Sequence, residues 1–310
     1  MKKIICSCYV FLTIILLTFV SCTDKKQQEH VTPIITHILN TKSTIENHLT
    51  HNVPTPVHPV FVSFWDFDGT ILKGDCSEGY EEEGTQIYKG LVQIAIEQKF
   101  SKFYKPDEFK KFFDYYLHSD KTQGHFTSYT YLTKIFAGQN EQTLVSLATN
   151  YFNSTLQRYY FASSLAIMKK LVENNIHIYI ISASPDFFVK GAAQSLNVHP
   201  NNIHGIKLKT TRGILTNTIM LPVTYAEGKT EKVKEILSTL KKSHSTEHVY
   251  ALAAFGNSYH TDGPFLRYVA TQKFPAGTPV AVMINGGTPP SEYHGIFQCV
   301  SYSQIIGDNN

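Results

Sequence analysis

Four short runs of apolar, largely β-branched or aromatic residues stand out along the chain. They lie at residues 60–65, 176–181, 249–255 and 280–284. Continuous apolar runs of this length are typical of strands that are buried on both faces of a sheet. Between them, apolar residues recur at the spacing of an amphipathic helix, as at Leu165, Met168 and Leu171. This alternation predicts an α/β fold in which helices cover both faces of a parallel sheet.

The stretch 75–158 has a different pattern, because its apolar positions recur with helical spacing. Four aromatic residues stand at i, i+3, i+4 and i+7, namely Phe109, Phe112, Phe113 and Tyr116. They follow Pro106 and two acidic residues, which favour the start of a helix. We predict helices here and no strand. The stretch is therefore expected to be a helical insertion after the first strand, with the α/β core built from 57–74 and 159–310.

Residues 1–22 have the layout of an export signal. Two lysines precede an apolar run from Ile4 to Val20, which is followed by Ser21 and Cys22. The end of this run resembles the lipobox of bacterial lipoproteins, in which the cysteine is lipidated, although Phe19 replaces the usual leucine. We expect a lipoprotein that is exported across the inner membrane and anchored in a membrane, periplasmic or at the cell surface. An uncleaved transmembrane anchor is the alternative.

The next segment, 23–56, is polar and runs into Pro54, Pro56 and Pro59. Such a composition favours an extended linker over a packed element. We expect a tether, with one short amphipathic helix at Ile34–Leu39.

Composition excludes several classes of protein. At 42% hydrophobic residues, the 310-residue chain is too apolar for general disorder. A formal charge of +3 is too close to balance to indicate a nucleic-acid partner. Outside the first segment only Cys76 and Cys299 remain, so no disulfide framework is expected.

Polar residues follow three of the predicted strands directly. Asp66 and Asp68 follow the first, Ser182 the second and Asn257 the third. Ligands of open α/β sheets bind beyond the carboxyl ends of the strands, so these side chains are expected to converge. Paired carboxylates with an amide oxygen suit a hard cation. Lys229, at a predicted helix start, supplies positive charge to the same place.

These residues resemble the four motifs of the haloacid dehalogenase superfamily of phosphatases. Asp66-Phe67-Asp68-Gly69-Thr70 matches the first motif, and Ser182 at the end of its strand matches the second. Lys229 matches the third, and the segment from Gly256 to Asp262 resembles the fourth. The resemblance implies a Rossmann-like core and identifies 75–158 as a helical C1-type cap. The Ser182-Ala183-Ser184 element is similar to the phosphoserine and phosphorylcholine phosphatase branch.

The resemblance also implies a role for each motif residue. Asp66 would be the nucleophile that forms an aspartyl-phosphate, and Asp68 the general acid and base. Ser182 would bind a phosphoryl oxygen, with helix capping as the alternative, while Lys229 and Mg²⁺ would neutralise charge. The metal ligands would be Asp66, Asp68, Asn257 and Asp262. The family usually has aspartate where this chain has Asn257, so metal affinity should be lower here unless Asp262 compensates.

Two further residues are candidates for contact with the substrate. His260 is near the fourth motif and Glu78 is early in the cap. The segment 80–161 holds 19 of the 38 Phe and Tyr residues of the chain. They would either pack the core of the cap or form an aromatic pocket for a cationic group.

The sequence therefore predicts a membrane-anchored, Mg²⁺-dependent phosphomonoesterase. Its substrate would be a small phosphorylated metabolite, with phosphocholine or another amino-alcohol phosphate first and phosphoserine second. The alternative is a metabolite-binding lipoprotein on the same scaffold, catalytically weak or silent because of Asn257.

Overall fold

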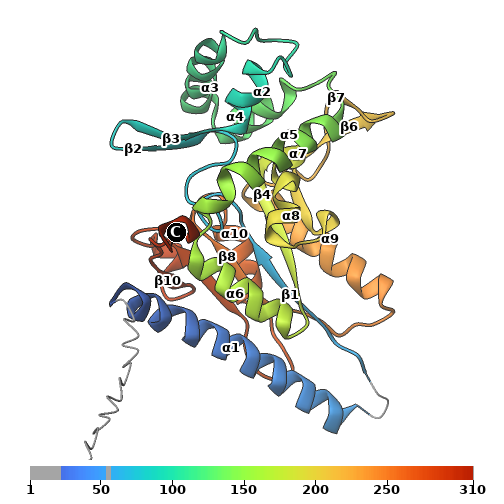
Figure 1. The fold of residues 1–310 in the computed structure, drawn as a ribbon. Helices are drawn as coiled ribbons and strands as arrows, with labels where there is room; N and C mark the ends of the chain where they lie inside the picture. Colours follow the sequence, from blue (N-terminus) through green and yellow to red (C-terminus); the bar gives the residue numbers. More distant parts are fainter. Residues whose placement is uncertain (1–21, 54–56, 310) are drawn as a thin grey trace, which may run out of the picture.

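A computed structural model describes residues 22–53 and 57–309 (Figure 1), with side chains described from Val31 onward. The predicted lipobox lies outside these residues, apart from Cys22 at the start of the first helix. In the described part of the chain, no helix is both long and apolar enough to cross a membrane.

A parallel sheet of six strands forms the centre of the molecule, in the order β10-β9-β8-β1-β4-β5. The strands are β1 (Val60–Trp65), β4 (Ile176–Pro185), β5 (Ile203–Ile206), β8 (Val249–Gly256), β9 (Val280–Ile284) and β10 (Gln298–Val300). Every residue of β1 is buried, because β4 and β8 flank it and helices cover both faces. The predicted α/β class and parallel sheet are confirmed.

Alternate residues of β1 point to opposite faces of the sheet, and each face has its own apolar cluster. Phe61 and Trp65 belong to the cluster that includes α1 (Cys22–Asn52) and α6 (Ala162–Glu173). Val62 and Phe64 belong to the other, which includes α9 (Glu227–Ser243) and α10 (Gly263–Ala270). The shorter α7 (Asp186–Val189) and α8 (Ala193–Leu196) follow β4.

The prediction of a tether at 23–56 is wrong for most of its length. Helix α1 is 31 residues long and packs against α6, β8 and β9. Its buried apolar residues recur every three, four or seven positions, at Val31, Ile34, Ile38, Ile45 and Leu49. This stripe lies among many polar residues, so the sequence pattern shows only its part at 34–39. The helix completes one apolar face of the sheet.

Residues 75–158, between β1 and α6, stand above the carboxyl ends of the central strands (Figure 1). Four helices form most of this cap, namely α2 (Leu91–Glu97), α3 (Phe109–Gln123), α4 (His125–Lys134) and α5 (Glu141–Ser154). The prediction that it holds no strand is wrong. It begins with an antiparallel hairpin of β2 (Gly79–Glu82) and β3 (Thr85–Lys89), fastened by Tyr88, whose hydroxyl donates to the Lys73 carbonyl at 2.7 Å.

A second hairpin extends from the core to the cap. It consists of β6 (Leu208–Thr211) and β7 (Ile214–Ile219), with a turn at Arg212-Gly213. Leu215 exchanges backbone hydrogen bonds with Gly138 and Gln139 of the cap, at 2.7 and 2.9 Å. The cap is thus joined to the core by this hairpin as well as by its own two chain connections.

Candidate active site

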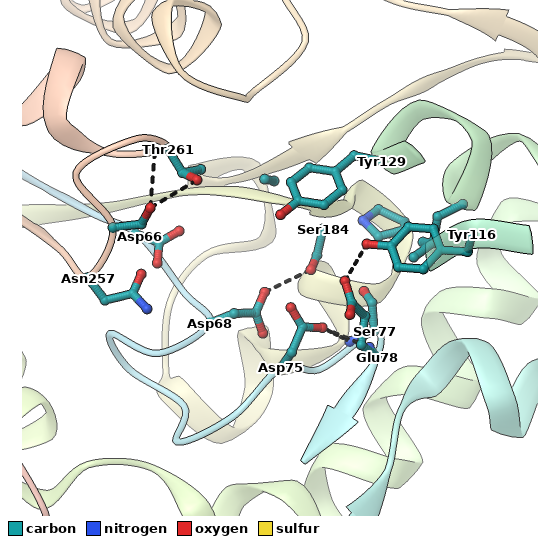
Figure 2. A pocket seen from close by; sticks show the side chains of 14 residues that line it. Asp66, Asp68, Asp75, Ser77, Glu78, Tyr116, Tyr129, Ser184, Asn257 and Thr261 are labelled. Carbon is teal, nitrogen blue, oxygen red and sulfur yellow. Dashed lines mark hydrogen bonds between the residues drawn. The ribbon is translucent and has the colours of Figure 1, made fainter. Parts of the chain in front are cut away.

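A cavity of about 190 Å³ lies between the carboxyl ends of β1, β4 and β8 and the cap (Figure 2). Its core side is lined by Asp66, Asp68, Ala183, Ser184, Pro185, Asn257, Ser258 and Thr261. Its cap side is lined by Asp75, Ser77, Glu78, Tyr116, Tyr129 and Leu132. Four of these side chains are carboxylic acids, so the cavity is strongly acidic.

The core side rests on a buried network of three charged groups. Lys229 Nζ lies 2.6 Å from an oxygen of Asp66 and 2.6 Å from an oxygen of Asp262. The Lys229 side chain is completely buried, in the first turn of α9. Gly228 permits this close packing, because a Cβ there would lie 1.8 Å from the Val223 carbonyl oxygen.

Asp66 is positioned by both its backbone and its side chain. Its N–H donates to the Phe255 carbonyl of β8 at 2.8 Å, and its second carboxylate oxygen accepts from the Thr70 hydroxyl at 2.9 Å. Between them, Gly69 turns the chain with φ of +73°, where a Cβ would lie 1.9 Å from the Asn257 amide nitrogen. The Asp-x-Asp-Gly-Thr motif is therefore required by geometry at several positions.

Asp68 accepts a second set of hydrogen bonds. The Cys76 N–H donates to one oxygen at 2.7 Å, and the other oxygen accepts from Ser184 at 2.7 Å and Ser182 at 3.3 Å. Only Ser184 lines the cavity, whereas Ser182 is buried and also receives the Ser184 N–H at 3.0 Å. Sequence reasoning selected Ser182, whereas the geometry places Ser184 in the cavity.

The acidity of both aspartates is altered by their surroundings. Burial, followed by the charge of Asp262, raises the pKa of Asp66 to about 6, against the lowering influence of Lys229 and Thr70. Burial, with Asp75 and Asp66 nearby, raises the pKa of Asp68 well above its ordinary value. A carboxyl group with a raised pKa is suited to donate a proton near neutral pH.

On the cap side, Asp75 and Glu78 face the cavity together with two tyrosines (Figure 2). Asp75 accepts the N–H groups of Ser77 and Glu78 at 2.7 and 2.8 Å, and Glu78 accepts the hydroxyl of Tyr116. Burial, with the charge of Asp75, raises the pKa of Glu78 to about 8. Neither acid has a salt bridge to a cation in the described residues. The structure thus brings the predicted Glu78 into the cavity and adds Asp75, Tyr116 and Tyr129.

His260 does not line this cavity. Its ring nitrogen is hydrogen-bonded to the Tyr225 hydroxyl, and its ring centre lies 5.6 Å from that of His125 on α4. Tyr129, also on α4, packs edge-on against Tyr225 at 5.6 Å. The structure therefore places His260 where the core meets the cap, rather than beside the predicted substrate.

The predicted metal ligands separate into two groups. Asp66, Asp68 and Asn257 all line the cavity and offer the oxygen donors that Mg²⁺ prefers. Asp262 does not line it, since one oxygen faces Lys229 and the other accepts the N–H groups of Asn257 and Ser258 at 2.9 and 3.0 Å. The expectation that Asp262 compensates for Asn257 as a ligand is corrected: Asp262 orients Lys229 and the loop that carries Asn257.

The donor set fits a hard divalent cation. Two carboxylates with raised pKa values share the cavity with an amide, and the ammonium that contacts Asp66, that of Lys229, does not line the cavity. The Asp68 and Asp75 carboxylates also lie within 4.8 Å of the Cys76 sulfur. Burial raises the pKa of the Cys76 thiol well above its ordinary value, which disfavours the thiolate needed to bind a metal.

The sequence profile of the haloacid dehalogenase-like hydrolase family matches residues 63–267. A protein of unknown function from Bordetella pertussis Tohama I has a similar structure, with a TM-score of 0.56, 12% identity, and coverage of 78% of this chain and 99% of that one. A functionally unknown protein from Anaerococcus prevotii gives 0.55 and 12%, covering 88% and 93%. A phosphoserine phosphatase with a phospho-aspartyl intermediate analogue gives 0.44 and 11%, covering 80% and 95%. No curated protein sequence matches.

Proposed function

Because the chain belongs to the haloacid dehalogenase-like hydrolases, which confirms the predicted enzyme class, we propose that it is a Mg²⁺-dependent phosphomonoesterase acting on a small phosphorylated metabolite. The observation that carries this proposal is the placement of Asp66 and Asp68 in one cavity, with Lys229 fixed behind Asp66 at 2.6 Å. This arrangement brings together a nucleophile (Asp66), a proton donor (Asp68) and a fixed positive charge (Lys229).

In the proposed reaction, a carboxylate oxygen of Asp66 attacks phosphorus, and the bond from phosphorus to the ester oxygen breaks. Asp68, whose raised pKa favours the protonated form, gives its proton to the departing alkoxide. Asp68 then accepts a proton from water, which hydrolyses the aspartyl-phosphate to restore Asp66 and release inorganic phosphate. Ser184 donates a hydrogen bond to Asp68 at 2.7 Å and so orients its carboxyl group.

Asp66, Asp68 and Asn257 would hold the metal ion. When bound, Mg²⁺ would neutralise charge on the phosphoryl group. The amide of Asn257 contributes an oxygen without the full negative charge of an aspartate, so the site relies more on the two aspartates. Lys229 neutralises Asp66 from the buried side, and Asp262 positions Lys229.

The substrate is proposed to be an amino-alcohol phosphate, with phosphocholine first and phosphoserine second. In support, the cap side offers two carboxyl groups, Asp75 and Glu78, beside Tyr116 and Tyr129. Acidic and aromatic side chains together suit a cationic amine or a quaternary ammonium group. A cavity of about 190 Å³ beneath a cap favours a small leaving group over a macromolecule.

We further propose that the protein is exported and lipidated at Cys22, which would place the enzyme at the periplasmic or outer side of a membrane. The support is the signal-like pattern of residues 1–22. Cells grown with a labelled fatty acid should incorporate the label into the wild-type protein and not into a Cys22→Ser variant. Equal labelling of the two would contradict lipidation.

The proposed activity is tested with purified protein that begins at residue 23. The wild type should hydrolyse a generic phosphate ester with Mg²⁺ and stop when the metal is chelated. Asp66→Asn should lose the activity, because the amide is a poor nucleophile, while Asp107→Asn on the exposed surface of the cap should not. An Asp66→Asn variant as active as the wild type would overturn the mechanism.

A second candidate function is suggested by Asn257, which leaves the metal site one charge short. A silent, metabolite-binding protein would be stabilised by phosphate esters without hydrolysing them.

The substrate assignment is tested with a panel of phosphocholine, phosphoethanolamine, phosphoserine, sugar phosphates and nucleotides. If the enzyme prefers sugar phosphates or nucleotides and does not hydrolyse phosphocholine, the proposal that the cap binds a cationic group is excluded.

A further inference from the structure

A second cavity, of about 320 Å³, lies beside the edge strand β5 and shares no lining residue with the first. Its walls come from four parts of the core: the segment after β4, strand β5, the segment 220–222 and helix α9. Three lysines line it, namely Lys190, Lys207 and Lys232. One acidic residue, Asp186, lines it with them. Basic residues therefore outnumber acidic ones in this cavity, whereas the charged residues that line the candidate active site are all acidic.

The charges around this cavity do not cancel. Lys190 Nζ lies 2.6 Å from Asp186, and Lys232 Nζ lies 2.5 Å from Glu235, whose side chain is 53% exposed. For Lys207, no salt bridge is found among the residues that the structure describes. An exposed partner such as Glu235 offsets little, because solvent screens it. Positive charges that line one cavity favour the binding of an anion.

His204 also lines this cavity. Its Nε2 is buried and makes no hydrogen bond with any described residue of the chain. Burial, reinforced by the three lysines and opposed by Asp186, lowers the pKa of His204 to about 4, so the ring is neutral at physiological pH. A neutral imidazole still carries one N–H, so the ring offers a hydrogen-bond donor without a charge.

An adjoining groove gives the site room for more than a free ion. It has a volume of about 870 Å³ and shares Lys190, Asn201 and Lys207 with the smaller cavity. Apolar side chains contribute to its wall, namely Val145, Ala193, Val198 and the ring of Pro200. A ligand with an anionic head in the basic cavity would have its organic part in this groove.

We propose that Lys190, Lys207, Lys232 and His204 form a second, non-catalytic site that binds the dianionic phosphate group of a small molecule. Three ammonium groups match a doubly charged oxyanion better than a single carboxylate. The group would come from inorganic phosphate or from a small organic phosphate. The site is separate from the reacting residues, so its occupation does not depend on whether the proposed hydrolysis is correct.

The test is a titration of the wild type, labelled with ¹⁵N in its histidine rings, without divalent metal. Inorganic phosphate should move the Nε2 resonance of His204, which is assigned by its loss in a His204→Gln variant. Potassium chloride of equal ionic strength should not. The double variant Lys207→Glu and Lys232→Glu should weaken the phosphate affinity at least tenfold. The matched double variant Lys209→Glu and Lys234→Glu, which reverses two exposed lysines of β6 and α9 outside the cavity, should leave it unchanged.

The two sources of phosphate are separated by a second titration with glycerol 3-phosphate. If glycerol 3-phosphate binds more tightly than inorganic phosphate, its organic part occupies the groove. If the two bind equally, the site recognises the phosphate group alone. Both results support the site. An unmoved His204 resonance at saturating phosphate, or equal weakening by the two double variants, would overturn it. Lys207→Met repeats the test without charge reversal, should the double variant fail to fold. Hydrolysis of a generic ester, measured on each variant, keeps this result separate from that of the active site.

Discussion

Charged groups are paired behind the core side of the acidic cavity and unpaired on its cap side. Asp66 and Asp262 share the buried ammonium of Lys229, so each of these three groups has a charged partner at 2.6 Å. Asp68, which accepts the N–H of Cys76 from the cap, has no salt bridge among the described residues. On the cap side, Asp75 and Glu78 are half-buried, and only N–H and hydroxyl groups serve as their hydrogen-bond donors among the described residues. A carboxylate that is paired with a cation is held in one position. An acid without such a partner either stays protonated or is available to bind a cation. We infer that the core side is built for chemistry and the cap side for selection.

The strongest test of the core side removes its shared cation. Lys229→Met should lower the free energy of unfolding by about 3–5 kcal/mol, because two buried carboxylates lose the one salt-bridge partner that they have among the described residues. Chemical denaturation measures this loss, and phosphatase activity should vanish with it. Lys234→Met, on the exposed face of the same helix, is the control. A loss of stability no greater than that of the control would mean that the network does not hold the site together.

The corresponding test of the cap side is Glu78→Gln. If an ammonium group of the substrate pairs with Glu78, kcat/KM for an amino-alcohol phosphate should fall roughly 10- to 100-fold, the range for a hydrogen bond to a charged group. Wild-type kcat/KM should rise with pH as Glu78 ionises around its pKa of about 8, and this rise should be absent in the variant. Glu81→Gln, which is exposed on β2, is the control.

The same substitution has a consequence for stability in the absence of substrate. The folded-state pKa of Glu78, about 8, lies above its ordinary value of 4.5. Between these pH values the folded protein keeps a proton that the unfolded chain has released, so Glu78 makes wild-type stability fall as pH rises. Thermal unfolding should therefore show the Glu78→Gln variant gaining stability relative to the wild type from pH 5 to pH 8. A constant difference would mean that Glu78 is ionised in the folded state.

The smallest expected effect concerns the metal on the core side. Asn257→Asp restores a full charge, and we expect its apparent Mg²⁺ affinity to rise roughly tenfold, equivalent to about 1.4 kcal/mol. Without metal the variant should be less stable than the wild type, because it adds a carboxylate to an acidic cavity. Thermal unfolding with and without Mg²⁺ measures both changes, with Asn197→Asp on the surface as control. Activity that appears only in the Asn257→Asp variant would favour the silent, binding function for the natural protein.

The core side could be predicted from sequence because its residues follow strands directly. Asp66, Asp68 and Asn257 stand immediately after apolar runs that define β1 and β8, so topology alone brings them together. The choice between Ser182 and Ser184 could not be made, because β4 continues through both, to Pro185. Which of the two hydroxyls reaches the cavity depends on the course of that strand.

The cap side was largely beyond prediction. Tyr116 and Tyr129 come from α3 and α4, and they reach the cavity only through the packing of those helices over the core. Among 19 aromatic residues in the segment 80–161, the sequence gives no sign of which face inward. The β2–β3 hairpin was missed for a related reason: its residues are mostly exposed and glutamate-rich, so no alternating apolar face marks it.

If the first residues of the chain were held at a surface, helix α1 would determine how the rest of the protein is oriented. At 1.5 Å per residue its 31 residues span about 46 Å, and the side chains from Val31 to Leu49 are locked into one apolar face of the sheet. Figure 1 shows this helix at one end of the molecule and the cap at the other. Because α1 is packed against the sheet, the rest of the protein turns together with it, whereas a flexible linker would let the two turn independently. Any tilt of this helix on such a surface would therefore be shared by the cap and by the cavity beneath it.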